Sequence, residues 1–470
     1  MSASVHLDAL PPQRVGTEPR SLTIFEKFCL ALVSFGSLMV FLALLSPNTL
    51  STYTSYWTAP ALTMGTIILG GLGYVISAYK GTTPGIKHNG MFFSSMSNRG
   101  VWGWMAGIAM TSFYVILYWH SSTLSGAIAL VEPISYALSG KHADQWFLYG
   151  FMYTVAILVM GSRMLMKYRH SRYQIIRTLS VMFFQLGFGF LIPNILKALN
   201  QPEFYFTYFW PLKPEYLLPW TFADGGTAAA GTTLITGLTV GRAMLLWAGM
   251  MSVIAVPTLT YFFGKRWYCS FVCGCGGLAE TLGDPYRQLS DNSDTAWKVE
   301  RWMIHSVLLA ITVITGLLWI NAATGNAILG NASGLYSKTY GFFIGAAFSG
   351  VIGVGFYPIM GSRVWCRFGC PQAAILGMFQ RFFSRFRITT NGGQCISCGN
   401  CSTYCEMGID VRAYAQRGEN IVRASCVGCG VCSDVCPRGV LKLENGSFGD
   451  RFKNAAKPFA AIADAFRGKS

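Results

Sequence analysis

Eight apolar stretches of roughly twenty residues alternate with polar connections along most of the chain. Each stretch is long enough to cross a hydrocarbon core of about 30 Å as an α-helix, and the interiors contain almost no charge. The pattern predicts an α-helical polytopic membrane protein with about eight spans. These lie near residues 25–45, 59–79, 101–119, 146–166, 177–197, 242–263, 302–322 and 341–361.

Beyond the last predicted span, the apolar spacing becomes that of an amphipathic helix. Over residues 374–390, apolar positions recur at helical intervals, with Arg381, Arg385 and Arg387 between them. A basic amphipathic helix of this kind is typical of a segment that lies on the inner leaflet of a membrane. We expect it to hold the region that follows against the bilayer surface.

The charge content agrees with a membrane protein. Only 12% of the residues are charged, whereas soluble domains average about 25%. The net charge of +16 would by itself fit a nucleic-acid-binding protein, but twenty-one basic residues fall in one set of connections and five in the other. Basic connections face the cytoplasm. With an even number of spans, this predicts a multi-pass protein of a bacterial inner membrane with both termini cytoplasmic, and no nucleic-acid partner.

Two cysteine runs near the C-terminus carry the clearest chemical signal. Residues 395–405 and 426–436 each read C-x2-C-x2-C-x3-C. This doubled run is the ligand pattern of two [4Fe–4S] clusters, in which the fourth cysteine of each run binds the other cluster. Paired zinc knuckles or disulfides would not need the third cysteine or the doubling. We expect Cys395, Cys398, Cys401 and Cys436 to hold one cluster, and Cys426, Cys429, Cys432 and Cys405 to hold the second.

The runs complete the predicted domain organisation, and intact cubanes favour the reducing cytoplasm for this region. We expect a small α+β ferredoxin-like domain to follow the membrane part. The predicted segments are a disordered tail over 1–24, a transmembrane domain over 25–373, an interfacial helix over 374–390, a double-cluster ferredoxin domain over 391–445 and a tail over 446–470.

A second cysteine group lies just past the ends of the sixth and eighth predicted spans. The two stretches are R-W-Y-C-S-F-V-C-G-C-G (266–276) and R-V-W-C-R-F-G-C-P (363–371), which look like copies of an internal repeat. We predict that Cys269, Cys273, Cys366 and Cys370 share one site, either a third metal or Fe–S site or a set of redox thiols. Nearby Arg266, Arg363 and Arg367 should lower the pKa of these thiols. Cys275 has no assigned partner, and Cys29 stands alone.

Other residue types add less. His120 and His305 belong to opposite membrane faces in the predicted topology, so no haem is expected between them. The connection 198–241 is rich in aromatic residues. That composition fits an interfacial aromatic belt, or else a lid over a quinone or a dock for a partner protein.

These motifs resemble the membrane-bound polyferredoxins of the NapH and NosR type. The stretches V-W-C-R-F-G-C-P-Q (364–372) and C-E-M-G-I-D-V-R (405–412) are also similar to the CcoG (FixG/RdxA) proteins, accessory to cbb3-type oxidase assembly. The resemblance covers about 242–445. Two positions depart from it, because Gly274 and Glu406 stand where proline is usual.

The resemblance implies a role in electron transfer. We expect the chain to pass electrons between a quinone pool or membrane redox partner and a cytoplasmic partner, within a respiratory chain. Two alternatives stay open, an assembly factor that reduces a metal for a respiratory enzyme and a redox-sensing regulator. No copper-type Met-x-Met array favours the first alternative. Whether the chain is itself an enzyme is open, and no catalytic residue is assigned.

Overall fold

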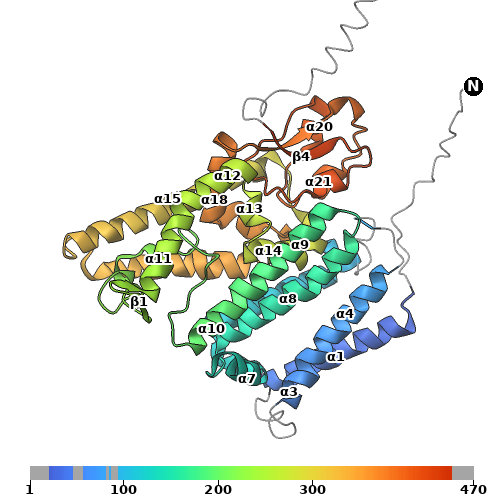
Figure 1. Ribbon diagram of the computed structural model, residues 1–470. Coiled ribbons are helices and arrows are strands. Elements are labelled where there is room, and N and C mark those ends of the chain that lie inside the picture. The colour runs from blue at the N-terminus through green and yellow to red at the C-terminus, as the bar shows by residue number, and fades with distance from the viewer. Residues whose placement is uncertain (1–20, 46–56, 81–83, 86–93, 447–470) are drawn as a thin grey trace, which may run out of the picture.

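The computed structural model describes residues 21–45, 57–80, 84–85 and 94–446, and shows a helical bundle with a small C-terminal head (Figure 1). In this described part, seven helices are long and apolar enough to cross a membrane. The predicted tails over 1–24 and 446–470 lie almost entirely outside the described residues. The seven candidate spans are Ile24–Leu44, Thr58–Tyr79, Val101–Trp119, Gln145–Lys167, Arg172–Ala198, Val240–Phe263 and Asp294–Ala323.

These spans correspond to seven of the eight predicted ones, and three of them contain a π-helical turn. Single helices form α1 (Ile24–Leu45), α6 (Val101–Trp119), α8 (Gln145–Lys167) and α15 (Asp294–Ala323). Composite spans are α3–η1–α4 (Thr58–Pro60, Ala61–Gly65, Thr66–Tyr79), α9–η4–α10 (Arg172–Phe184, Gln185–Leu191, Ile192–Ala198) and α11–η7–α12 (Val240–Met250, Met251–Ala255, Val256–Phe263).

The eighth predicted span, 341–361, is not a continuous helix. It consists of the π-helix η10 (Gly341–Ile352), a turn, and the short helix α17 (Tyr357–Met360). Gly353 and Gly355 form the turn, and a Cβ on Gly355 would lie 2.2 Å from the Val351 carbonyl oxygen. The glycine-rich sequence therefore interrupts the segment. The helix α16 (Ser333–Tyr340) runs directly into η10, but this run is not among the seven helices that are both long and apolar enough to cross a membrane. The placement of the termini therefore rests on the charge asymmetry.

The connections contain further short elements. They are α5 (Ser94–Ser97), η3 (Ser121–Leu124), α7 (Ser125–Ser139), η5 (Pro214–Leu217), η6 (Pro219–Thr221), β1 (Thr233–Ile235), β2 (Leu238–Thr239), α13 (Arg266–Cys269), α14 (Gly274–Thr281), η8 (Asp284–Leu289), η9 (Gly330–Ala332), α16 (Ser333–Tyr340) and η11 (Trp365–Gly369). Strands β1 and β2 form a small antiparallel hairpin. None of these elements was predicted from the apolar pattern, which is silent on short connections.

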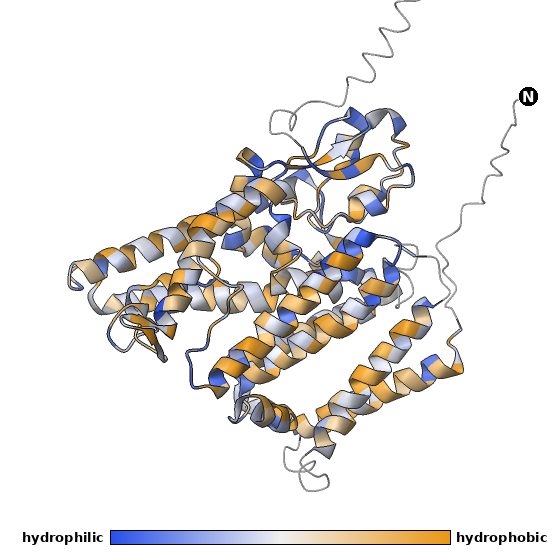
Figure 2. Cartoon of the chain, viewed as in Figure 1, coloured by the Kyte–Doolittle hydropathy of each residue, from blue (hydrophilic) through white to orange (hydrophobic). Residues whose placement is uncertain are grey.

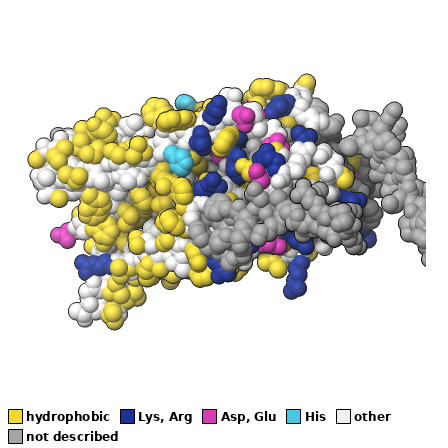
Figure 3. All heavy atoms as spheres, turned by 90° about the horizontal axis from the view of Figure 1, so that it is seen from above, with side chains coloured by type: hydrophobic (Ala, Val, Ile, Leu, Met, Phe, Trp, Pro, Cys, Tyr) yellow, Lys and Arg dark blue, Asp and Glu magenta, His cyan; other side chains and the backbone are white. Residues whose placement is uncertain are grey.

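The surface of the bundle is apolar, as expected for helices that face lipid. Large side chains such as Ile108, Val253 and Leu309 are exposed on different spans. Figure 2 shows hydrophobic residues along the helices and hydrophilic ones concentrated where the bundle meets the head. Seen from above, most charged side chains gather in the right half of the face and hydrophobic ones prevail in the left half (Figure 3). The structure thus suggests a multi-pass membrane protein.

The head begins earlier than predicted. Helix α18 (Pro371–Phe382) ends within the predicted interfacial helix 374–390, and strand β3 (Phe386–Thr390) follows it. Leu376 and Gln380 of α18 are buried, so this helix packs inside the protein and exposes Met378, Arg381 and Phe382. One helix does not extend over 374–390, because Phe386–Thr390 pairs with β4 as a strand.

The head is a small α+β unit closed by a two-stranded sheet. Strand β3 pairs antiparallel with β4 (Leu441–Asn445), from Phe386 opposite Asn445 to Thr390 opposite Leu441. Between the strands lie η12 (Gly392–Gln394), α19 (Asn400–Thr403), α20 (Val411–Arg417) and α21 (Val431–Asp434). Both cysteine runs therefore lie between the two strands of one sheet.

Candidate functional site

The head contains two small cavities, and each is lined by four cysteines. One is lined by Cys395, Cys398, Cys401 and Cys436. The other is lined by Cys405, Cys426, Cys429 and Cys432. Each group takes three cysteines from one run and the fourth from the other run. The donor sets are thiols alone, which is the ligand chemistry of a [4Fe–4S] cluster.

The two runs also adopt matching backbone conformations. Gly399 and Gly430 have left-handed φ values of 80° and 79° at the starts of α19 and α21. This conformation suits glycine because a Cβ would be strained there. Each turn places the third cysteine of its run, Cys401 or Cys432, on the first turn of a short helix. The repeated turn brings three sulfurs of each run around one cavity.

Backbone N–H groups point at the sulfurs of the two exchanged cysteines. The Ile409 N–H donates to Cys405 Sγ at 3.4 Å, and the Val440 N–H donates to Cys436 Sγ at 3.3 Å. Donors of this kind stabilise the negative charge that a thiolate or a bound cluster carries. The residues present therefore fit the two clusters that the runs imply.

The second cysteine group is assembled at the junction of bundle and head, from two similar substructures. Cys269 ends the short helix α13, and Cys273 caps the N-terminus of α14. Likewise Cys366 lies in the short helix η11, and Cys370 caps the N-terminus of α18. We call these four residues with Cys275 the membrane-edge set. The matching placement supports the predicted internal repeat.

The structure brings the membrane-edge set together in one buried place. Burial raises the pKa of the Cys370 thiol well above its ordinary value, and the neighbouring Cys366, Cys273 and Cys269 raise it further. Cys275 is linked to Cys273 by a thiol–thiol hydrogen bond. It also packs against both apolar clusters that contain the other four cysteines. Cys275 is therefore the fifth member of the group that sequence left unassigned.

The expected lowering of the thiol pKa values is wrong for most of this set. Burial raises the pKa of Cys269 to about 12 and outweighs Lys265 and Arg363. Only Cys273 has a lowered pKa, about 7, because it accepts hydrogen bonds from the Cys275 thiol and from the Gly276 and Cys275 N–H groups.

The arginines do not surround the thiols as expected. Among the three, Arg363 does approach the set, since its Nη1 lies 3.7 Å from Cys366 Sγ and 3.3 Å from the Cys269 carbonyl oxygen. Arg266 lies over the Phe386 ring at 4.7 Å, and Arg367 donates to Glu300 at 2.8 Å. In the described part of the chain, no three His, Cys, Asp or Glu side chains are arranged to hold a single metal ion.

A buried network of charges lies beside the membrane-edge set, near the junction of the bundle and the head. Asp284 accepts from Arg163 Nη1 at 2.7 Å and from Lys167 Nζ at 2.6 Å, and pairs with Arg287 Nε at 3.3 Å. Glu280 pairs with Arg177 and Arg363. All of these side chains are almost completely inaccessible to solvent. Burial alone would raise the pKa of Asp284, but the three surrounding cations hold it well below its usual value.

Glu406 connects this network to both cysteine groups. Its carboxylate pairs with Arg287 Nη1 at 3.0 Å and with Arg363 Nη2 at 3.1 Å. Arg287 Nη1 also lies 3.7 Å from Cys429 Sγ in the head. Hydrogen bonds and one ion pair therefore run from Cys366 through Arg363, Glu406 and Arg287 to Cys429. Although burial raises the pKa of Glu406, the two arginines lower it to about 2, so it is ionised.

Sequence reasoning assigned these arginines to membrane topology and did not find the network. Arg163, Arg177, Arg287 and Arg363 all counted among the twenty-one basic residues of the cytoplasmic connections. One signal was present in the sequence, since Glu406 replaces a proline that is usual after the fourth cysteine. An acidic residue at that position needs a buried cation, and the arginines supply it.

Further buried contacts fasten the head to the bundle. Gln380 Nε2 donates to the carbonyl oxygens of Arg423 and Cys426, each at 2.7 Å. Gln174 Nε2 donates to the Cys429 carbonyl oxygen at 3.0 Å, and the Tyr173 hydroxyl donates to the Gly428 carbonyl oxygen at 2.6 Å. The head is therefore held rigidly against the bundle, although by packed contacts rather than by an interfacial helix.

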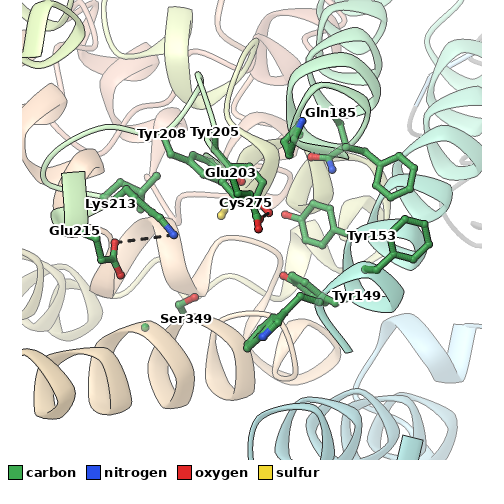
Figure 4. Close-up of a pocket in the computed structure, with 18 of the residues that line it drawn as sticks. Tyr149, Tyr153, Gln185, Glu203, Tyr205, Tyr208, Lys213, Glu215, Cys275 and Ser349 are labelled. Carbon is green, nitrogen blue, oxygen red and sulfur yellow. Dashed lines mark hydrogen bonds and ion pairs between the residues drawn. The ribbon is translucent and has the colours of Figure 1, made fainter. Parts of the chain in front are cut away.

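On the other side of the membrane-edge set lies a cavity of about 640 Å³ (Figure 4). Cys275 lines it, together with tyrosines of α8 and of the aromatic connection 198–241. In that connection Phe204 and Phe209 are fully buried, whereas Tyr205 and Tyr208 line the cavity. The connection is thus packed into the fold and covers a cavity, which a simple interfacial belt would not do.

Comparisons with known proteins agree with these assignments. A family model described as a 4Fe-4S dicluster domain matches residues 394–441. Another, described as a 4Fe-4S binding domain, matches twice, at residues 245–291 and 341–389. The 4Fe-4S binding model matches once over Cys269, Cys273 and Cys275 and once over Cys366 and Cys370. Two matches of one model are what an internal repeat requires.

Two curated proteins are similar to this chain over about a third of its length. The putative electron transport protein YccM of Escherichia coli strain K12 is 27% identical over 174 residues, covering 35% of this chain and 47% of YccM. The methylamine utilization ferredoxin-type protein MauN of Methylobacillus flagellatus is 24% identical over 166 residues, covering 34% of this chain and 56% of MauN. The chain thus spans about half the length of the curated relatives it matches. No solved structure matches it. The family matches and the two four-cysteine cavities together identify the chain as an iron–sulfur protein with two [4Fe–4S] clusters.

Proposed function

We propose that this chain is a membrane-anchored iron–sulfur electron-transfer protein. It exchanges electrons with a quinone pool or another membrane redox partner and with a cytoplasmic partner, as a component of a respiratory chain. The family descriptions support this, as do the printed names of the relatives, an electron transport protein and a ferredoxin-type protein.

In this proposal the eight head cysteines are the cluster ligands. When bound, [4Fe–4S] clusters supply one-electron transfer. The Ile409 and Val440 N–H groups donate to cysteine sulfurs and stabilise the added negative charge of the reduced state. Each cavity takes one cluster: Cys395, Cys398, Cys401 and Cys436 hold the first, and Cys405, Cys426, Cys429 and Cys432 hold the second.

The membrane-edge set forms a third redox site. Cys269, Cys273, Cys366 and Cys370 are the proposed ligands of an iron–sulfur group, since the 4Fe-4S binding description covers both segments that carry them. Redox-active thiols without a metal are the alternative. The set lies between the bundle and the head, which suits a relay between membrane and cytoplasm.

The contact chain from Cys366 to Cys429 carries the proposal. Arg363, Glu406 and Arg287 join the two cysteine groups through consecutive contacts of 3.7, 3.1, 3.0 and 3.7 Å. Their burial excludes water and fixes their positions. A short, rigid and bonded connection is what efficient electron transfer between two sites needs. The arginines also stabilise the extra negative charge on either side.

The exposed edge of the head supplies a docking place for the second partner. Cys398 is exposed, and the neighbouring Ile396 is 58% exposed, whereas Cys426 and Cys432 are buried. The first cluster site is therefore the one that a soluble protein can approach. We assign this edge to the cytoplasm because cubanes persist in a reducing compartment and the connections near the head are basic.

Substitution at the membrane-edge set tests the function. Anaerobically purified and reduced protein in lipid nanodiscs should carry the signals of the two head clusters by electron paramagnetic resonance, apart from any signal of the membrane-edge set. Cys366→Ser should leave both head signals unchanged and slow electron transfer from a membrane donor to a soluble acceptor at least tenfold. Cys29→Ser serves as the control, since Cys29 packs between α1 and α4, away from both cysteine groups.

Two outcomes would contradict the proposal. Unchanged transfer in Cys366→Ser would show that the membrane-edge set is not on the route. A purified chain with zinc and no sulfide would remove the redox chemistry altogether.

A further inference from the structure

The cavity beside Cys275 has the size and position of a small-molecule site. Its volume of about 640 Å³ lies within the range of about 300–1,000 Å³ typical of ligand pockets. It extends from the start of α8 and the connection 198–241 inward to the membrane-edge set. The head contacts the chain just past the opposite end of α8, where Ser171 and Tyr173 donate to Asp434 and to the Gly428 carbonyl oxygen. The start of α8, which lines the cavity, therefore lies at the end of this helix away from the head (Figure 1).

The floor of the cavity touches both halves of the membrane-edge set. Cys275 lies there and is hydrogen-bonded to Cys273. Trp365 and Pro371 also line the floor, next in sequence to Cys366 and Cys370. A molecule bound at this depth would contact the redox site directly. The ligand must therefore be able to gain or lose electrons if the cavity serves the proposed function.

The walls suit a flat ring that carries oxygen atoms. Tyr149, Tyr153 and Tyr208 surround the deep part of the cavity, with Gln185 on the facing helix (Figure 4). Aromatic side chains stack on a planar ring, and phenol hydroxyls and an amide can donate to its oxygens. Burial raises the pKa of Tyr208 well above its ordinary value, which keeps its hydroxyl protonated and able to donate.

The mouth is charged and offers contact with water. Lys213 pairs with Glu215 at 4.0 Å, and Lys197 pairs with Asp144 at 3.8 Å. Glu203 also lines this end and accepts from the Tyr205 hydroxyl at 2.7 Å. Carboxylates at the mouth and tyrosines deeper inside can exchange protons with the solvent.

We propose, building on the function above, that this cavity binds the ring of a quinone-class carrier at the end of the bundle away from the head. A bound quinol loses two electrons and two protons and becomes the quinone, and the reverse step consumes them. The electrons pass one at a time to or from the membrane-edge set beside Cys275. The protons exchange with water at the charged mouth. Cys275 is then the sulfur nearest the ring, which gives the fifth cysteine a role.

Two glycines of η10 provide a matched pair of variants. Gly345 lines the cavity and Gly341 does not, yet a Cβ at either position would meet nothing within 4 Å. Gly345→Phe should fill part of the cavity, while Gly341→Phe adds the same side chain to the same helix elsewhere. Both should keep the two head cluster signals.

Binding is measured directly with a short-chain benzoquinone whose ring is fully substituted, so that it cannot add to thiols. Trp146 and Trp365 line the cavity and should be quenched on binding. We expect Gly345→Phe to raise the Kd at least tenfold and Gly341→Phe to leave it within twofold. The quinone should also slow alkylation of Cys275 in the wild type and in Gly341→Phe.

The outcomes separate this inference from the proposed function. Equal Kd values in the two variants, or no protection of Cys275, would overturn the quinone site while electron transfer through Cys366 could still be intact. If Gly345→Phe, Gly341→Phe and Cys366→Ser all kept the wild-type rate of electron transfer, the proposed function would be contradicted, whatever the quinone affinity. Tyr153→Phe keeps the ring and removes one hydroxyl, so a Kd raised severalfold there would show that the oxygen of the ligand is recognised.

Discussion

The two cysteine groups of this protein are assembled in different ways. In the head, each cavity draws its cysteines from residues 395–436, a stretch short enough for the sequence motif to specify the grouping. The membrane-edge set joins segments that are separated by about ninety residues and by the whole of α15. Packing of α15 against η11 and α18 brings the second segment into place. A local motif thus defines the first group, and only the tertiary fold defines the second.

The groups differ in their surroundings as well. The head has an exposed edge at Cys398, whereas Cys269, Cys273, Cys366 and Cys370 are all buried. Burial raises the pKa of most of the membrane-edge thiols, and among the described contacts Arg363 reaches the sulfur of Cys366. The head can therefore meet a soluble protein, while the membrane-edge set lies inside the protein beside two cavities, one lined by Cys275 and the other by Cys366.

The largest expected effect is a loss of iron on substitution of Cys405, the fourth cysteine of the first run, which lines the cavity of the second run. Cys405→Ser should remove the cluster formed by the second run, although Cys405 belongs to the first run. The protein should retain about four of the eight head irons, and the remaining signal should be that of the cluster at Cys395. Iron and sulfide analysis with electron paramagnetic resonance measures this. If Cys405→Ser instead removed the cluster at Cys395, the grouping would follow sequence order.

Breaking the connection between the groups comes next. Glu406→Gln removes the charge that Arg287 and Arg363 share in a fully buried place. Removal of one partner from a buried ion pair costs about 3–5 kcal/mol. We expect the head to become sensitive to limited proteolysis and the melting temperature to fall. Glu419→Gln is the control, because the Arg417–Glu419 pair is exposed and such pairs contribute about 0–1 kcal/mol. Equal stability of the two variants would mean that the network does not hold the head.

A smaller effect is expected where α12 meets the head. Gly264 has a φ of 70°, and a Cβ there would lie 2.7 Å from the side chains of Gln380 and Phe386. Gly264→Ala should therefore cost about 1–3 kcal/mol through strain and displaced contacts. Gly249→Ala in α11 is a control with open space at its Cβ. Thermal unfolding of the two variants in the same detergent gives the comparison.

The smallest effect belongs to the cysteine outside both groups. Cys29 is buried between α1 and α4, and its sulfur would lie 2.8 Å from a Cβ added to Gly73. Cys29→Ser should change neither the iron content nor the rate of electron transfer. A loss of iron in this variant would place a ligand in the first span and enlarge the second group.

The features that the sequence predicts are the local ones, and the features that it does not predict depend on the tertiary fold. Seven spans and the four-and-four grouping in the head depend on apolar length and on ligand spacing, both of which are local. The role of Arg163, Arg287 and Arg363 depends on distant partners, and basic residues at the ends of spans look alike whether they face lipid headgroups or a buried carboxylate. The turn at Gly353 and Gly355 in the eighth apolar segment and the strand that begins at Phe386 were not predicted. Hydrophobicity alone does not report backbone conformation.

The mouth of the cavity and the head lie at opposite ends of the bundle, and this has an electrical consequence. Helix α8 runs between them for 23 residues, about 35 Å at the rise of an α-helix. In the proposed function, electrons enter or leave through the head while the accompanying protons exchange at the mouth, so the two charges separate across part of the membrane field. A full crossing against a potential of 100 mV changes the free energy by about 2.3 kcal/mol per charge. The rate and the direction of transfer should accordingly respond to the membrane potential, and turnover should generate or consume it.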